Sequence, residues 1–113
     1  FIGDSRAIPK LNELLEDDEP NIRWDSAIAL AKMGEESSVP IIENLMDREY
    51  LMTFPELDYK EINKVIMTAI ETSSLVLDNR FEPRLVELAR SDESLTVRDA
   101  AIKTLKKSYD RII

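Results

Sequence analysis

Residues 20–34, PNIRWDSAIALAKMG, carry the clearest structural signal of the chain. Pro20 is favoured in the first turn of a helix, where its missing N–H group is not needed. Gly34 is a common residue just after a helix ends, because it adopts a left-handed backbone without strain. The apolar residues between them recur at helical spacing and are Ile22, Ala29, Leu30 and Met33. The stretch therefore predicts one helix with an apolar face.

The same spacing extends along the chain in both directions. Pro9 and Pro40 open two further apolar segments, and Asp58 and Ser94 stand where helix N-caps are expected. Every segment follows the 3.6-residue period, and no window shows a sustained period of two. We therefore predict an all-α fold.

The predicted helices also pair and repeat. Pro9, Pro40 and Pro83, which open the first helix of each pair, lie 31 and 43 residues apart. The second helices have core positions eight residues apart, at 22–30, 62–70 and 97–105. The 12 extra residues of the middle unit divide into nine between its helices and three after them. Because one helical hairpin cannot bury its apolar face alone, we predict an α-α superhelix, a solenoid of about three hairpins.

Short motifs within these units point to a family. The first unit carries RAIP at 6–9, IR at 22–23 and MG at 33–34, and the other units repeat the pattern less fully. The pattern resembles the HEAT-like repeat of the phycobilisome (PBS) lyase type, which implies a HEAT/armadillo-like architecture. On this resemblance the repeats cover about 5–34, 37–77 with an insertion at 48–58, and 78–111.

The resemblance also implies a ladder of ion pairs. An acid at each hairpin turn would pair with the Arg that opens the second helix. The middle unit has Asn63 at the position of that Arg, which would interrupt the ladder and leave the middle joint less stiff. The expected pairs are Asp17 or Asp18 with Arg23, and Asp92 or Glu93 with Arg98.

The first residues resemble the close of a preceding helix. Ile2-Gly3-Asp4 matches Met33-Gly34-Glu35 in this respect. We therefore expect a fragment of a longer array, and self-association through Ile2 and Ile8 at this end.

Composition excludes several classes of function. The chain has no His and no Cys, so a thiolate or imidazole metal site, a Cys nucleophile and a His-based triad are excluded. With 23 acids against 15 bases, and a net charge of −8, nucleic acid is not expected as the ligand. No apolar run approaches the length of a membrane span, and no signal-peptide pattern opens the chain. We expect a cytoplasmic protein that is not an enzyme and that has no cofactor, metal or membrane partner.

The insertion is the most informative local feature. It interleaves aromatic residues and Met with acids, a composition typical of contact surfaces. The alternative is that its apolar residues fold back over the end of the hairpin, because the loop would otherwise expose an apolar patch. The two interpretations are compatible. The candidate contact residues in and next to the insertion are Tyr50, Met52, Phe54 and Tyr59.

Four residues of the second helices complete the candidate site. Trp24 would be a binding anchor if it is exposed, and a packing residue between repeats if it is half-buried. Ile28 lies one turn after it, as Met67 does after Asn63. In solenoids of this kind the second helices line the concave face.

These features predict a protein-binding scaffold without catalytic activity. The partner would contact the concave face and the insertion, and the acidic runs favour a partner with a basic segment. Two alternatives remain open at this stage. The chain could be an accessory or catalytic subunit of a bilin lyase, or a purely structural segment of a larger protein.

Overall fold

The computed structural model describes residues 5–112, and within that range every regular element is helical. The predicted all-α fold is confirmed. The residues Ile2-Gly3-Asp4 lie outside the described range. The elements are η1 Ser5–Ala7, α1 Ile8–Leu14, α2 Pro20–Lys32, η2 Glu36–Ser38, α3 Val39–Leu45, α4 Arg48–Leu51, α5 Tyr59–Val76, α6 Phe81–Ser91 and α7 Leu95–Ser108.

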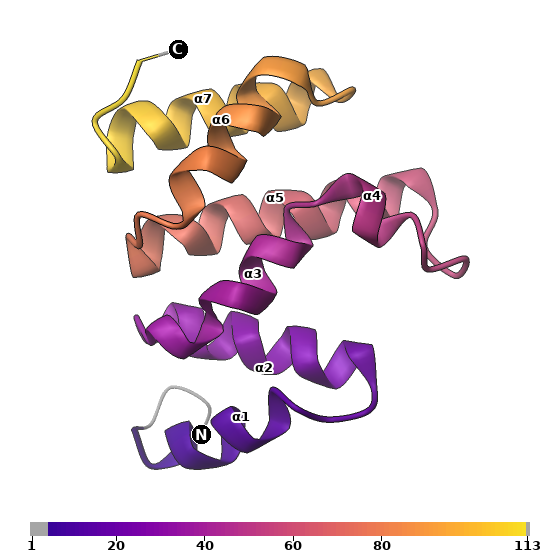
Figure 1. The fold of residues 1–113 in the computed structure, drawn as a ribbon, viewed down its shortest axis with the longest axis vertical. Helices are drawn as coiled ribbons and strands as arrows, with labels where there is room; N and C mark the ends of the chain where they lie inside the picture. The colour runs from indigo at the N-terminus through magenta and orange to yellow at the C-terminus, as the bar shows by residue number, and fades with distance from the viewer. Residues whose placement is uncertain (1–4, 113) are drawn as a thin grey trace.

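The helices stack as pairs in two layers. α1 packs on α2, α3 on α5, and α6 on α7. α2 also contacts α5, and α5 contacts α7, so these three helices form one continuous layer. They run in the same direction, from right to left in Figure 1. The shortest dimension of the chain is 19 Å, about twice the ~10 Å diameter of a helix, as two layers require. This arrangement is a solenoid-like stack.

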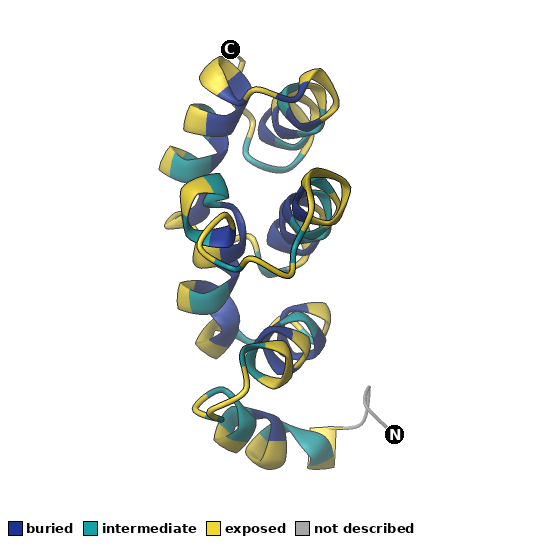
Figure 2. Ribbon diagram, turned by 90° about the vertical axis from the view of Figure 1, so that its right-hand side faces the viewer, coloured by how far each residue is buried: buried dark blue, intermediate teal, exposed yellow. Residues whose placement is uncertain are grey.

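The core lies between the two layers. In Figure 2 the buried side of each layer faces the other layer, and the exposed side faces solvent. Each layer supplies fully buried aliphatic residues, such as Ile42 and Leu85 from one layer and Ile66 and Leu105 from the other. Burying such side chains stabilises a fold by roughly 1.5–3 kcal/mol each. A second, smaller cluster joins α1 to α2. Ile8 is half-buried against it rather than fully open.

Local sequence signals set several helix ends as predicted. Asp58 and Glu61 form a reciprocal capping box at the start of α5. The Ser94 hydroxyl accepts a hydrogen bond from the Val97 N–H at the start of α7. Gly34 ends α2 with a φ of 77°, the left-handed conformation that glycine favours. The N–H groups of Gly34 and Glu35 return to carbonyls of α2 at 2.9 and 3.0 Å.

One predicted core position is wrong. Ile22, aligned with the buried Ile62 and Val97 of the other pairs, is 38% exposed. The core position at the start of α2 is filled instead by Trp24, which is 7% exposed. No helix of the described residues is both long and apolar enough to cross a membrane.

Candidate protein-binding site

The insertion folds as one short helix and a returning loop. Asp47 caps α4, because its carboxylate accepts hydrogen bonds from the N–H groups of Glu49 and Tyr50 at 3.1 and 3.3 Å. Leu51 is fully buried, and Phe54 and Leu57 are half-buried against the main core. The insertion therefore folds back over the hairpin, as the second interpretation of its sequence predicts.

Three aromatic rings fasten the insertion to α2. The ring centroids of Trp24 and Phe54 lie 5.0 Å apart, and those of Tyr50 and Phe54 lie 5.2 Å apart. Trp24 and Tyr50 are 6.3 Å apart. All three pairs are edge-to-face, a geometry worth about 0.5–1.5 kcal/mol per pair beyond the area buried. The cluster gives α4 a rigid attachment.

This packing corrects part of the predicted contact surface. Trp24 is buried, so the interpretation of Trp24 as an exposed anchor is wrong. Tyr50 and Phe54 are half-buried and turn their rings toward Trp24 rather than outward. Ile28 is half-buried against the core. Because these four side chains pack against the core or against one another, they offer a partner little exposed surface.

Arg48 connects the insertion to the next helix pair. Its guanidinium donates two hydrogen bonds to the Asp92 carboxylate, at 3.0 and 2.9 Å, and one to the Asn63 side-chain oxygen at 2.7 Å. The side chains of Arg48 and Asp92 are only 10% and 3% exposed. The hydrogen bonds to Asp92 raise the pKa of the Arg48 guanidinium above its ordinary value, and burial opposes that rise. The guanidinium also lies 5.4 Å from the centre of the Tyr59 ring, within cation–π range.

The ion-pair ladder expected from the resemblance does not form as predicted. Arg23 donates to the backbone carbonyls of Asp17 and Asp18, at 2.8 and 3.2 Å, and not to their carboxylates. Asp92 pairs with Arg48 instead of Arg98.

Asn63 is therefore not a gap in a ladder. It accepts a hydrogen bond from Arg48 in the same network that contains Asp92. The only sequence signal for this role is that position 63 lacks the Arg present at the matching positions 23 and 98. A cation from another element can therefore occupy the space of that Arg. That the cation comes from position 48 is visible only in the folded chain.

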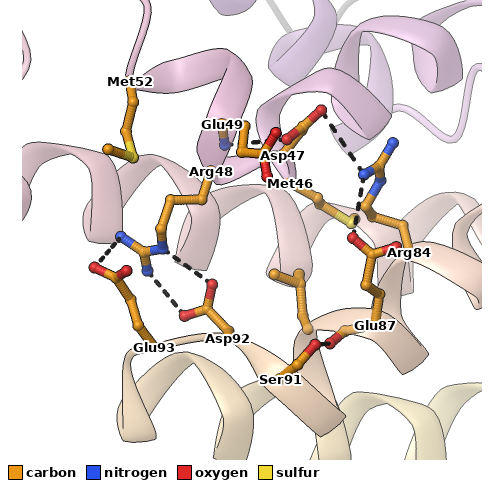
Figure 3. A pocket seen from close by; sticks show the side chains of 11 residues that line it. Met46, Asp47, Arg48, Glu49, Met52, Arg84, Glu87, Ser91, Asp92 and Glu93 are labelled. Carbon is orange, nitrogen blue, oxygen red and sulfur yellow. Dashed lines mark hydrogen bonds and ion pairs between the residues drawn. The ribbon is translucent and has the colours of Figure 1, made fainter.

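A pocket of about 520 Å³ opens beside this network, between α4 and α6 (Figure 3). Five carboxylates and two guanidinium groups line it, together with apolar and hydroxyl side chains. Arg84 lies 3.8 Å from Asp47 and 3.7 Å from Glu87, so it links α6 to the start of α4. We name this the α4 pocket; its lining residues are Met46, Asp47, Arg48, Glu49, Met52, Arg84, Glu87, Leu88, Ser91, Asp92 and Glu93.

Two predicted contact residues are exposed at the edge of the α4 pocket. Met52 is 63% exposed and lines the α4 pocket. Tyr59 is 53% exposed and lies over Arg48. The last predicted residue, Met67, is half-buried and lies away from them, in a groove between α5 and α7. Apart from Ile28 and Asn63, the predicted residues therefore lie in three places. These are the aromatic cluster that attaches the insertion to α2, the exposed edge of the α4 pocket, and a separate groove between α5 and α7.

The α4 pocket offers charged and apolar side chains for contact with another molecule. In the described part of the chain, no group of three or more acidic side chains is placed to hold a metal ion. The pocket combines one exposed thioether, fixed guanidinium groups and several carboxylates. Such a set can bind another chain by apolar contact and charge complementarity.

Comparison with known sequences agrees with the architecture. Residues 1–53 match the family model for HEAT repeats. No curated protein and no solved structure matches the chain. The match supports a HEAT-like repeat protein, and it covers the first helix pair, α3 and α4.

Proposed function

We propose that the chain is a non-catalytic protein-binding scaffold, with the α4 pocket and its edge as the contact surface. HEAT repeats commonly serve as interaction scaffolds, and residues 1–53 match that family. We extend the same repeat to residues 54–113, because α6 and α7 pair and stack as the preceding helices do. The three helix pairs would then be three repeats, with the insertion inside the second.

One observation carries the proposal: an exposed Met52 stands beside a pocket whose walls are held by buried and half-buried ion pairs. Arg48 with Asp92, and Arg84 with Asp47, tie α4 to the third helix pair. A wall held in place loses little conformational entropy when a partner binds, which favours affinity. An exposed Met is an adaptable apolar contact.

The charge of the pocket selects the kind of partner. Five carboxylates against two guanidinium groups leave a net negative charge. Glu49 is exposed, and the Glu93 side chain is 60% exposed at 4.0 Å from Arg48. We infer a partner segment that carries Lys or Arg next to an apolar side chain, with the apolar group on Met52. Such an encounter is faster at low salt.

The test uses the chain as bait in a lysate of its source, followed by titration with each captured protein after purification. Met52→Lys removes the proposed apolar contact and adds a charge that repels a basic partner, and Met52 is too exposed to be part of the core. We expect it to weaken binding by about tenfold or more, as central contact residues do. Leu75→Lys is the matched control, since Leu75 is 53% exposed on α5, away from the α4 pocket.

Three results would contradict the proposal. Equal weakening by Met52→Lys and Leu75→Lys would show that the effect is not local to the α4 pocket. Unchanged binding of the captured partner by Met52→Lys would move the contact elsewhere on the chain. If no protein is captured specifically, the contacts of this segment are intramolecular, and the chain is a structural part of a larger protein.

The finer resemblance, to PBS-lyase repeats, supplies an alternative function as a bilin-lyase subunit. It is tested by mixing the chain with free bilin and recording the visible spectrum. A new absorbance band that disappears with pocket variants would favour this alternative over the scaffold. We place the scaffold first because the α4 pocket is lined mainly by charged groups, whereas small-molecule pockets are mostly apolar.

A further inference from the structure

A second surface lies in the layer of second helices, between α5 and α7. Its residues follow helical spacing on both sides of the groove. On α5 they lie at positions 67, 70, 71 and 74, and on α7 at 100, 103, 104, 107 and 108. Residues with this spacing share one face of a helix, so each helix offers a single stripe. We name this the α5–α7 groove; it is lined by Met67, Ile70, Glu71, Ser74, Ala100, Lys103, Thr104, Lys107 and Ser108.

The two sides of the groove differ in charge. Along its α7 side, Lys103 and Lys107 are exposed and one turn apart. Neither makes an ion pair with any residue between 5 and 112. On the α5 side the only charged lining residue is Glu71. In a chain with a net charge of −8, this groove is therefore locally basic on one side.

The floor of the groove is apolar and shallow. Met67 and Ala100 are half-buried, and Ile70 is 2% exposed beneath them. The groove has a volume of about 330 Å³. From Ala100 to Ser108 it is about 12 Å long, at about 1.5 Å per residue. That length matches about two turns of a partner helix.

We infer that the α5–α7 groove docks a short acidic amphipathic helix of another protein. Apolar side chains one turn apart would lie on Met67 and Ala100, which is the usual way in which a helix binds a groove. Asp or Glu side chains on the edge of that helix would face Lys103 and Lys107. The inference rests on the protein-binding role proposed above, but it assigns a different surface and a partner of opposite charge to that of the α4 pocket.

The test is a display selection from random 16-residue peptides against the full 113-residue chain. We expect one enriched class to combine Asp or Glu with apolar residues at helical spacing. Peptides of this class should shift amide NMR signals along α5 and α7. Lys103→Gln with Lys107→Gln should weaken their binding about tenfold, since each exposed ion pair contributes a few-fold.

Two single variants sharpen the result. Lys106→Gln removes a positive charge from α7 outside the groove, and it should change binding less than twofold. Glu71→Gln removes the only acid of the groove, and it should tighten binding about two- to threefold. If Lys106→Gln weakens binding as much as Lys103→Gln with Lys107→Gln does, then binding depends only on net charge, and the inference would be wrong.

The outcome separates the two proposals. If the enriched peptides are basic and map to the α4 pocket, the groove inference is overturned while the proposed function stands. Enrichment of acidic peptides that depend on Lys103 and Lys107, together with unchanged capture by Met52→Lys, would support the groove and overturn the α4 pocket as the contact surface. A selection that enriches no peptide at the groove also overturns this inference.

Discussion

The Arg48 guanidinium and the Asp92 carboxylate join two successive helix pairs across 44 residues of sequence. Arg48 opens the insertion of the second pair, and Asp92 lies at the turn between α6 and α7. Asp92 also accepts a hydrogen bond from the Ser94 N–H at 2.9 Å, so one carboxylate both orders the turn and binds the insertion. This pair forms one wall of the α4 pocket, which makes the shape of the pocket depend on it.

Breaking this pair from either side should be costly. Arg48→Met leaves a buried carboxylate without its cation, and Asp92→Asn leaves a buried guanidinium without its anion. We expect each variant to lower the free energy of unfolding by about 2–4 kcal/mol. The double variant should lower it by less than the sum, with a coupling energy of about 1.5–3 kcal/mol in denaturant titrations.

The exposed pair of Arg80 and Asp78 is the matched control. It has similar geometry, with hydrogen bonds of 2.9 Å, but the Arg80 side chain is 51% exposed. Water screens such a pair, so Arg80→Met should change stability far less than Arg48→Met. If the Arg48 and Asp92 variants prove additive, the pair does not hold the two helix pairs together.

The aromatic cluster makes a second prediction. Phe54→Ala removes the ring that contacts both Trp24 and Tyr50. Because Phe54 is half-buried, we expect a loss of about 2–3 kcal/mol, below the ~3–5 kcal/mol of a fully buried Phe. Trp24 is the only Trp of the sequence, so its emission reports on this site. The emission of the folded variant should shift to longer wavelength, because removing Phe54 exposes the indole to water.

Tyr50→Phe is the control for that experiment. It keeps the ring, and the Tyr50 hydroxyl makes no hydrogen bond to the residues that the structure describes. Stability should stay within about 0.5 kcal/mol, with unchanged Trp24 emission. A large loss in this variant would mean that the hydroxyl, and not the edge-to-face ring contacts, holds the insertion.

The sequence predicted those features that depend on local signals. The capping residues Asp58 and Ser94 start α5 and α7, and Gly34 ends α2, because a cap or a left-handed residue acts within one turn of the helix. The pairing and stacking of the helices also followed from periodicity, since each apolar face needs a neighbour.

The site could be predicted only in part, because its geometry depends on contacts distant in sequence. Whether Trp24 is exposed is decided by Tyr50 and Phe54, which come from the insertion in the next helix pair. Periodicity placed Ile22 in the core, but the insertion covers Trp24 instead and leaves Ile22 at the surface. Arg48 carried no local signal at all. Its role appears only when the insertion meets the turn that contains Asp92.

Two backbone positions with positive φ should respond to substitution in opposite directions. At Gly34 a Cβ would meet nothing within 4 Å, so Gly34→Ala adds backbone strain alone and should cost about 1 kcal/mol. Leu77 ends α5 with a φ of 55°, a strained conformation for a bulky residue, and it is 55% exposed. Leu77→Gly relieves the strain and loses little burial, so we expect a gain of about 0.5 kcal/mol. Thermal unfolding of both variants measures this, and a clear loss in Leu77→Gly would show that side-chain contacts outweigh strain.

The last prediction concerns alkaline pH and the contact between α7 and α5. The Tyr109 hydroxyl donates a hydrogen bond to the Ser73 carbonyl at 2.8 Å. Burial raises the pKa of Tyr109 to about 12, against an ordinary value of 10.0. In the unfolded chain Tyr109 ionises near its ordinary pKa, whereas in the folded chain it stays neutral until a higher pH. The unfolded state therefore binds fewer protons between these two values, and stability falls as pH rises through this window.

Tyr109→Phe should remove this component of the pH dependence. At neutral pH the variant should lose about 1 kcal/mol, the contribution of one hydrogen bond, because the Ser73 carbonyl keeps its bond from the Leu77 N–H. Between pH 9 and 11.5 the stability of the variant should fall less steeply than that of the parent chain. The two proteins differ only at position 109, so the difference between the two curves isolates Tyr109. Parallel curves in urea titrations across this range would mean that Tyr109 ionises equally in the folded and unfolded chains.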